Sequence, residues 1–348
     1  MKRIKKWKLA VGVLAIVLVA GLCWDHYRRS VSDLPDEPIP MAPFQYNNLY
    51  LIENSRFGIS SDGTNARATT DGINQAIQWA KKNGYEGVSL SSGVYAIACS
   101  WDDPYTLPSD GILVPSDTVL DLGKAVLRIE SNDQPAYNLI YTLKGRNIVI
   151  NGGVLEGDRD THVYSGPSTH EWGCGVNIVA SSEVTVQNMT IHGMTGDAIT
   201  VRGGGGVNSS GFVVQNNKLY DCRRQGISVT GGVDGVLQDN TIYGIKGTDP
   251  QCGIDIEANS GYQATGLVIQ RNNISNCGFA SIQCYTGSDY LVRENTCVNG
   301  GILVGSRTKG LTVEDNVLKS SILRVLGTDT KVTVEDNQLD RSSKLEYK

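Results

Sequence analysis

Positive charge and nucleic-acid signatures are scarce in this sequence. The formal net charge is −5, with 31 Lys and Arg residues against 36 Asp and Glu residues. A protein that binds phosphate backbones needs a basic surface, and the net negative charge of this chain does not indicate one. We therefore expect no nucleic-acid partner and favour a neutral or weakly charged one.

Metal and phosphate motifs are also missing. No Cys/His spacing typical of a metal site is present, and the glycine run Gly203–Gly206 follows an expected strand but leads to no helix, unlike a phosphate-binding loop. We expect no cofactor. A weak Ca²⁺ site made by Asp197, Asp255 and Glu257 is the one alternative left open.

Large aromatic side chains are few as well, with only four phenylalanines beside forty glycines. The hydrophobic fraction of 40% is nevertheless enough to form a core, so disorder is excluded and a turn-rich fold is indicated. A chain of this length can be one domain if it repeats, because solenoids add coils to a single core.

The first residues predict export. Lysines and one arginine precede an uncharged run at residues 9–24, which is the order of a secretory signal or a signal-anchor. We expect residues 1–30 to be such a segment, favouring an uncleaved anchor slightly, and the proline-rich residues 31–45 to be an extended linker. The folded part at 46–345 is then held at the cell membrane outside the cytoplasm, or is secreted if the signal is cleaved.

Cysteine usage gives no closed disulfide framework. There are eight cysteines, and Cys23 lies in the N-terminal segment, so an odd number remains. Cys222, Cys277 and Cys297 each lie five residues before an isoleucine of successive repeats, which predicts one stacked column of small buried side chains.

A short phrase recurs from about residue 145 onward, as in Val236-Leu237-Gln238-Asp239-Asn240-Thr241-Ile242. The asparagine at the Asn240 position of this phrase recurs roughly every 21 to 23 residues, with one longer interval. A period of this length corresponds to one coil of a solenoid. The aligned asparagines are Asn217, Asn240, Asn272, Asn295, Asn316 and Asn337. Stacked amides can satisfy one another, so we assign this row to architecture.

Each phrase is paired with a second one, such as Gly253-Ile254-Asp255-Ile256. Two apolar residues flank an outward residue, which indicates a short strand that must stack to bury its apolar side. A helix predicted at 71–82, with Thr69 or Thr70 as N-cap and Asn83-Gly84 as its end, covers the first coil. The predicted fold is all-β, a right-handed parallel β-helix with an N-terminal capping α-helix.

These features resemble the pectate-lyase-like β-helix superfamily, which includes polygalacturonases and phage tailspikes. The resemblance is carried by Phe57-Gly58, Asp62-Gly63, Asp71-Gly72-Ile73-Asn74-Gln75-Ala76-Ile77 and Gly93-Val94-Tyr95, together with the coils, and covers nearly the whole folded part.

The run Val184–Ile191 leading to Gly196-Asp197-Ala198 is similar to the polygalacturonase run that ends in Gly-Asp-Asp. Here Ala198 replaces the second acid, Cys174 lies where the first acid is expected, and Arg224-Gln225 replaces Gly-His. The resemblance therefore implies the fold and gives little support to galacturonan hydrolysis.

The outward residues of the second phrase predict a site on one strand face. The column is Asn177, Thr200, Ser228, Asp255, Gln283 and Leu303, and long loops cluster beside it. We predict Asp197, Asp255, Glu257 and Arg224 as catalytic residues, because hydrolysis needs two carboxyl groups, one protonated and one ionised. The expected substrate-binding residues are Asn177, Arg202, Gln225, His170, Glu171, Trp172, Gln283 and Tyr285, with the loop at 158–172 as a wall.

The predicted function is a polysaccharide-active, membrane-anchored extracellular protein, a monomer, acting as a glycoside hydrolase. A lyase or epimerase remains open, since such chemistry needs a base and a group that neutralises a carboxylate. The residues available for it are Arg202, Arg223, Arg224 and Tyr285. A non-catalytic glycan-binding solenoid or adhesin is the third alternative, because fold alone does not decide function.

Overall fold

A computed structural model describes residues 46–100, 106–327 and 331–348. The predicted signal segment and linker at 1–45 lie outside these residues. In the described part of the chain, no helix has both the length and the apolar character needed to cross a membrane. Residues Asn48–Lys348 form one compact unit.

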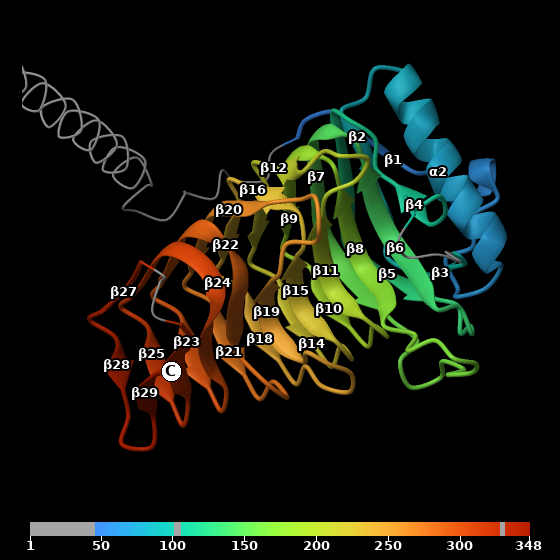
Figure 1. The fold of residues 1–348 in the computed structure, drawn as a ribbon. Coiled ribbons are helices and arrows are strands. Elements are labelled where there is room, and N and C mark those ends of the chain that lie inside the picture. Colours follow the sequence, from blue (N-terminus) through green and yellow to red (C-terminus); the bar gives the residue numbers. More distant parts are fainter. Residues whose placement is uncertain (1–45, 101–105, 328–330) are drawn as a thin grey trace, which may run out of the picture. The chain divides into compact units, whose positions relative to one another are not determined.

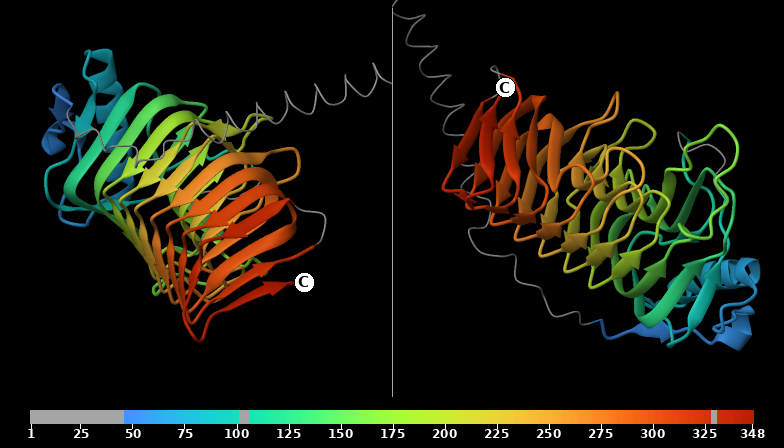
Figure 2. Two further views of the ribbon diagram at one scale, coloured as in Figure 1. Left: turned by 90° about the vertical axis from the view of Figure 1, so that its left-hand side faces the viewer. Right: turned by 90° about the horizontal axis from the view of Figure 1, so that it is seen from below.

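Three rows of parallel strands wind around a common axis in this unit (Figures 1 and 2). Row 1 contains β4 (Ile112–Leu113), β6 (Ala136–Leu143), β8 (Trp172–Val179), β11 (Asp197–Arg202), β15 (Gln225–Val229), β19 (Cys252–Ile256), the first parts of β22 (Ile282–Arg293) and β24 (Gly301–Glu314), β26 (Ile322–Val325) and β29 (Lys344–Tyr347).

Row 2 contains β1 (Leu49–Leu51), β2 (Gly87–Ser89), the first parts of β5 (Thr118–Ile129) and β7 (Arg146–Glu156), β9 (Ser182–Gln187), β12 (Ser209–Ser210), β13 (Val213–Gln215), β16 (Gly232–Val233), β17 (Val236–Gln238), β20 (Ala264–Gln270), the second parts of β22 and β24, and β27 (Val332–Glu335). Row 3 contains β3 (Val94–Ile97), the second parts of β5 and β7, β10 (Thr190–His192), β14 (Lys218–Tyr220), β18 (Thr241–Tyr243), β21 (Asn273–Ser275), β23 (Thr296–Val298), β25 (Val317–Lys319) and β28 (Gln338–Leu339).

The predicted parallel β-helix is confirmed, and so is its register. In row 1, Ile199 pairs with Ile227 and Ile227 with Ile254, and all three side chains are fully buried. Burying one such side chain contributes about 1.5–3 kcal/mol, and a strand of three to five residues gains it only when its neighbours stack. The apolar half of each repeat therefore forms the core.

The asparagine row is a hydrogen-bonded ladder at the turn between rows 2 and 3. The side chain of Asn240 donates to the carbonyl of Val214 and to Asn272 Oδ1, at 2.9 and 3.0 Å. Asn240 Oδ1 in turn accepts from the backbone and side chain of Asn217, both at 3.0 Å. The same pattern continues through Asn295 and Asn316 to Asn337. These side-chain amides are hydrogen-bonded to one another and to the backbone of the coil, as predicted.

The capping helix is longer than predicted. Helix α2 (Ala66–Lys82) follows the one-turn helix η1 (Asn54–Phe57) and contacts β2, β3 and β4 at the first coil (Figure 1). It ends at Asn83 as expected, but Thr69 and Thr70 lie inside it. Thr70 Oγ1 donates to the carbonyl of Ala66 at 2.9 Å and accepts from the Ala98 N–H at 3.0 Å. This threonine ties the helix to the coil and does not cap it.

The described cysteines are all free and buried. The predicted single column is wrong for Cys297, which pairs with Ile274 inside row 3. Cys222 and Cys277 lie two residues after strands β14 and β21. The connection from β23 to β24 is only two residues long. The position five residues before Ile302 therefore falls inside a row 3 strand, whereas in the other two coils it falls in the turn after that strand.

Candidate functional site

The predicted polar column lies on the outer face of row 1. Thr200 pairs with Ser228, Ser228 with Asp255, and Asp255 with Gln283. This register follows from the inward isoleucines, because residues on either side of an inward residue point outward. The column is buried, with Asp197 and Asp255 each only 2% exposed. The sequence predicts an open groove here, and the structure shows instead that these two carboxyl side chains are buried.

Asp197 and Arg224 form an ion pair at the start of strands β11 and β15. Arg224 Nη1 lies 3.2 Å from Asp197 Oδ2 and 3.3 Å from Oδ1. Thr200 Oγ1 donates to Asp197 Oδ2 at 3.1 Å. Burial raises the pKa of Asp197, and the Arg224 guanidinium opposes this rise. Trp172 lies against the pair, with the Arg224 guanidinium 5.0 Å from the centre of its ring.

Asp255 lies between two amide side chains. Gln225 Nε2 donates to Asp255 Oδ2 at 2.8 Å, and Gln283 Nε2 donates to Oδ1 at 2.9 Å. Burial raises the pKa of Asp255 to about 6; the Gln283 amide opposes this, and the Glu257 carboxylate adds to it. This carboxyl group therefore exchanges its proton close to neutral pH. Such a carboxyl is suited to general acid or base chemistry.

Several buried polar atoms of this face have no hydrogen-bond partner among the residues that the structure describes. They are Asn138 Nδ2, Asn177 Oδ1, Arg224 Nε, Gln225 Oε1 and Ser228 Oγ. Asn177 does donate its amide to Asn138 Oδ1 at 2.8 Å. An unpaired buried polar atom costs about 1–3 kcal/mol, so such atoms mark a place where water or a ligand is accommodated. Asn138 escaped the sequence analysis, although an asparagine within the apolar strand Ala136–Leu143 is a usable signal.

The loop at 158–172 is held together by a chain of imidazole hydrogen bonds. His162 Nδ1 lies 2.8 Å from Asp158 Oδ2, and His162 Nε2 lies 2.9 Å from His170 Nδ1. His170 Nε2 bonds the carbonyl of Ser165 at 2.6 Å. Both ring nitrogens of His170 are therefore used inside the loop and not on the polar column. Arg223 attaches the loop to the next coil by donating to the carbonyl of Thr169 at 2.7 Å.

The remaining predicted residues surround the column without joining it directly. Glu171 Oε2 accepts a bond from Thr248 Oγ1 at 3.5 Å, and its charge acts on Arg224. Arg202 donates to the carbonyl of Thr106 at 2.6 Å, and burial lowers its pKa. Tyr285 packs beneath the Arg307 guanidinium, 4.6 Å from its ring centre. Glu257 lies directly after the end of β19, two residues beyond Asp255, and its charge raises the pKa of Asp255.

No metal cluster forms among the residues that the structure describes. No three His, Cys, Asp or Glu side chains come together there in a way that holds a metal ion. The site thus consists of the Asp197–Arg224 pair, the amide-held Asp255 and the unpaired amides beside them. Chemically, it offers one carboxyl next to a cation and one carboxyl that titrates near neutral pH.

Comparisons with known proteins agree with this architecture. The model of the family described as "right handed beta helix region" matches residues 109–266 and 174–339. These matches cover more than half of the chain, so the chain belongs to the right-handed β-helix family. The SPbeta prophage-derived uncharacterized protein YorA of Bacillus subtilis (strain 168) is 29% identical over 279 residues, covering 72% of this chain and 46% of the relative. The chain thus spans about half the length of that relative.

Two solved structures share the fold. One is the iota-carrageenase of family GH82 from A. fortis. The match covers 88% of this chain and 91% of the carrageenase chain, with a TM-score of 0.63 and 11% identity. The Streptococcus pneumoniae surface protein and adhesin PfbA covers 86% of this chain and 99% of its own, with a TM-score of 0.56 and 14% identity. At these identities the likeness establishes the fold and nothing more.

Proposed function

We propose that this member of the right-handed β-helix family acts on a polysaccharide, as a glycoside hydrolase that works through Asp197 and Asp255. The observation that carries the proposal is the Asp255 carboxyl, whose pKa is raised to about 6 while two glutamine amides hold both of its oxygens. Near neutral pH this group can supply or take up a proton in a fixed position.

The two carboxyl groups take different roles. Asp255 acts as the general acid, because burial favours its protonated form. We assign Asp197 as the base that activates water: burial raises its pKa, but the Arg224 guanidinium 3.2 Å away opposes this rise and favours the ionised form. Asp197 itself is in register with Cys252, but its carboxylate accepts a hydrogen bond from Thr200 Oγ1, and Thr200 is in register with Asp255. Thr200 and Asp255 are two strand spacings apart, or roughly 10 Å at ~4.8 Å per strand. Side-chain reach brings this close to the ~6.5–9.5 Å separation of inverting glycosidases.

The amides beside the carboxyls supply recognition. The unpaired Asn177 Oδ1 and Gln225 Oε1 accept hydrogen bonds, and Asn138 Nδ2 and Arg224 Nε donate them. Sugar hydroxyls both donate and accept, so they match this mixture. Trp172 offers an apolar ring face next to Arg224, which suits the apolar face of a sugar.

A product assay tests the reaction class. The protein is incubated with a panel of neutral and uronic polysaccharides, and reducing ends and unsaturated products are measured separately. Hydrolysis predicts new reducing ends without unsaturation. Unsaturated products assign the site to a lyase, and a change of sugar configuration without cleavage assigns it to an epimerase, with Arg224 beside the substrate carboxylate in both cases.

A non-catalytic glycan-binding solenoid is the second candidate function. It is favoured by one observation, the burial of Asp197 and Asp255, since a closed polar network on a solenoid face needs no substrate. In this candidate the site variants change stability only. Glycan binding without any product from the panel supports it.

We also propose that the protein works outside the cytoplasm, held at the membrane by residues 9–24. The proposal is supported by the basic residues before this uncharged run. Cell fractionation with an antibody to the β-helix checks it. Recovery of the protein from the cytoplasmic fraction would contradict the proposal, and a secreted form lacking the run would replace the anchor by a cleaved signal.

A further inference from the structure

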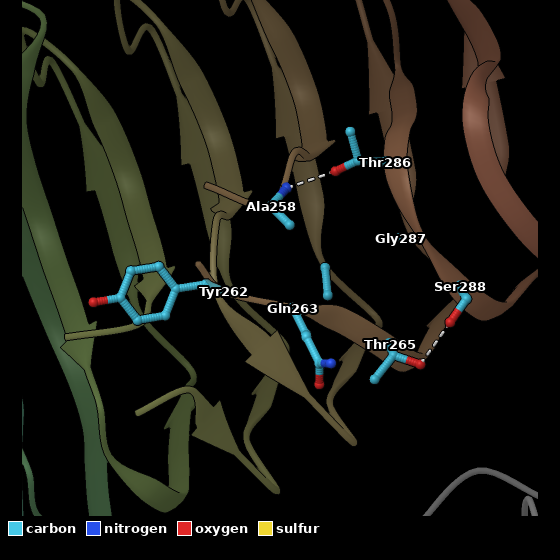
Figure 3. Close-up of a pocket in the computed structure, with 8 residues that line it drawn as sticks. Ala258, Tyr262, Gln263, Thr265, Thr286, Gly287 and Ser288 are labelled. Carbon is cyan, nitrogen blue, oxygen red and sulfur yellow. Dashed lines mark hydrogen bonds between the residues drawn. The ribbon is translucent and has the colours of Figure 1, made fainter. Parts of the chain in front are cut away.

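A pocket lies beside the column, at the corner between rows 1 and 2 (Figure 3). Its volume is about 360 Å³, at the lower end of the ~300–1,000 Å³ usual for ligand sites. None of its lining residues carries a charge, and they are Ala258, Tyr262, Gln263, Ala264, Thr265, Thr286, Gly287 and Ser288. The pocket is therefore polar through hydroxyl and amide groups.

The hydroxyl hydrogens of two pocket residues, Thr265 and Ser288, are already used in hydrogen bonds. Ser288 Oγ donates to Asp289 Oδ2 at 2.8 Å. Thr265 Oγ1 lies 3.0 Å from Ser288 Oγ and 3.3 Å from Asp289 Oδ2. In either donor direction, both hydroxyl hydrogens are used within this trio of side chains. Ser288 and Thr265 thus present lone pairs to the pocket and need a ligand that donates.

Tyr262 lines the pocket, and its ring points away from Thr265, Thr286 and Ser288 into the neighbouring coils (Figure 3). A Cβ atom on Gly203 would lie 2.0 Å from Tyr262 Cδ1, so only glycine leaves room for this ring. The N–H of Gly206 donates to Tyr262 Oη at 3.4 Å. On the other side, Thr286 Oγ1 is fixed by the Ala258 N–H at 2.7 Å, as Figure 3 shows.

The pocket lies just beyond the candidate site on two neighbouring coils. Ala258 lies three residues beyond Asp255, and Thr286 lies three residues beyond Gln283, its paired neighbour. At ~3.3 Å per residue this is roughly 10 Å. A chain-like ligand bound at the carboxyl groups can therefore extend into the pocket.

From these contacts we infer that the pocket binds a sugar unit of a neutral polysaccharide. Neutral sugars carry several hydroxyl donors for Thr265 and Ser288. A uronate or sulfate group has only acceptor oxygens. It would face the oxygen lone pairs of Thr265 and Ser288, beside the Asp289 carboxylate, and would be repelled. The inference rests on the proposed function, because it takes the ligand to be part of a polysaccharide.

Calorimetric titration with defined hexasaccharides tests the inference. The probes are hexamers of glucose, of mannose and of galactose, and hexagalacturonate as the charged counterpart. We expect the parent to bind at least one neutral hexamer more tightly than hexagalacturonate. The double variant Thr265→Val with Ser288→Ala is expected to bind it about 10-fold or more weakly, since two acceptors are lost.

Two further variants separate binding from folding. Thr265→Ser keeps the hydroxyl and should retain the parent affinity. Thr241→Val, at an exposed threonine of row 3, should leave affinity unchanged and serves as the matched control. The inference is overturned if the double variant binds like the parent, if hexagalacturonate is preferred, or if no neutral hexamer binds.

Failure of the inference and failure of the proposed function give different results. Asp255→Asn should remove turnover and keep neutral hexamer binding. If the double variant binds as the parent does while Asp255→Asn is inactive, the pocket inference alone fails. If the double variant loses binding but no glycan yields product, the hydrolase assignment alone fails.

Discussion

Asp255→Asn should make the protein more stable at alkaline pH, by an amount that depends on pH. Folding raises the pKa of Asp255 from 3.8 to about 6 because the side chain is buried. In this range the folded state binds more protons than the unfolded state, so stability falls as pH rises from the lower to the upper value. Asparagine keeps the shape and has no charged form to bury.

The size of the effect follows from the two pKa values. Ionising the buried carboxyl costs about 1 kcal/mol at pH 4.5 and about 3 kcal/mol at pH 8, where the cost has reached its plateau. We therefore expect the difference in free energy of unfolding between variant and parent to increase by about 2 kcal/mol, in favour of the variant, from pH 4.5 to pH 8. Its amide can pair with Gln225 Oε1, which has no partner in the parent.

Denaturant unfolding of parent and variant at pH 4.5, 6 and 8 measures this difference. The control is Asp133→Asn at an exposed carboxyl, which reports the effect of a surface substitution. A difference between parent and Asp255→Asn that is the same at all three pH values would refute the reasoning. It would mean that Asp255 is as well solvated in the folded protein as in the unfolded chain.

Three other changes test the contacts around the site and the coil. Arg224→Met should cost about 3–5 kcal/mol in denaturant unfolding, because Asp197 is left buried without its cation, and adding Asp197→Asn should recover much of the loss. Asn240→Ala should cost about 1–3 kcal/mol by leaving buried backbone groups unpaired, and clearly more than Asn337→Ala at the half-buried end of the ladder. His162→Leu should raise amide hydrogen exchange in its loop, because it breaks the bonds to both ring-nitrogen partners.

The sequence predicts the coil well because the coil repeats. Asn217 and its equivalents align in the sequence, and each takes the same place in the ladder. The same register correctly places Asp255 beside Gln283 and two strands from Asp197. Period and register are local properties, so a single chain is enough to read them.

Other features depend on how connections fold back over the coil, which has no period. His170 was predicted to bind substrate, but its ring nitrogens bond His162 and Ser165 inside the loop. The burial of Asp197 is likewise invisible in the pattern of its strand. The pocket beside Tyr262 also escaped prediction, since its wall depends on a contact with Gly203 that is distant in the sequence.

The most direct test of the central claim is the turnover of Asp255→Asn on a glycan that the parent cleaves. Rates are compared at pH 6 after circular dichroism has established that both proteins are folded. Removing a general acid lowers the rate by about 100- to 10,000-fold, and the account predicts a loss of that size with neutral hexamer binding retained. Turnover of Asp255→Asn at the rate of the parent would contradict the account.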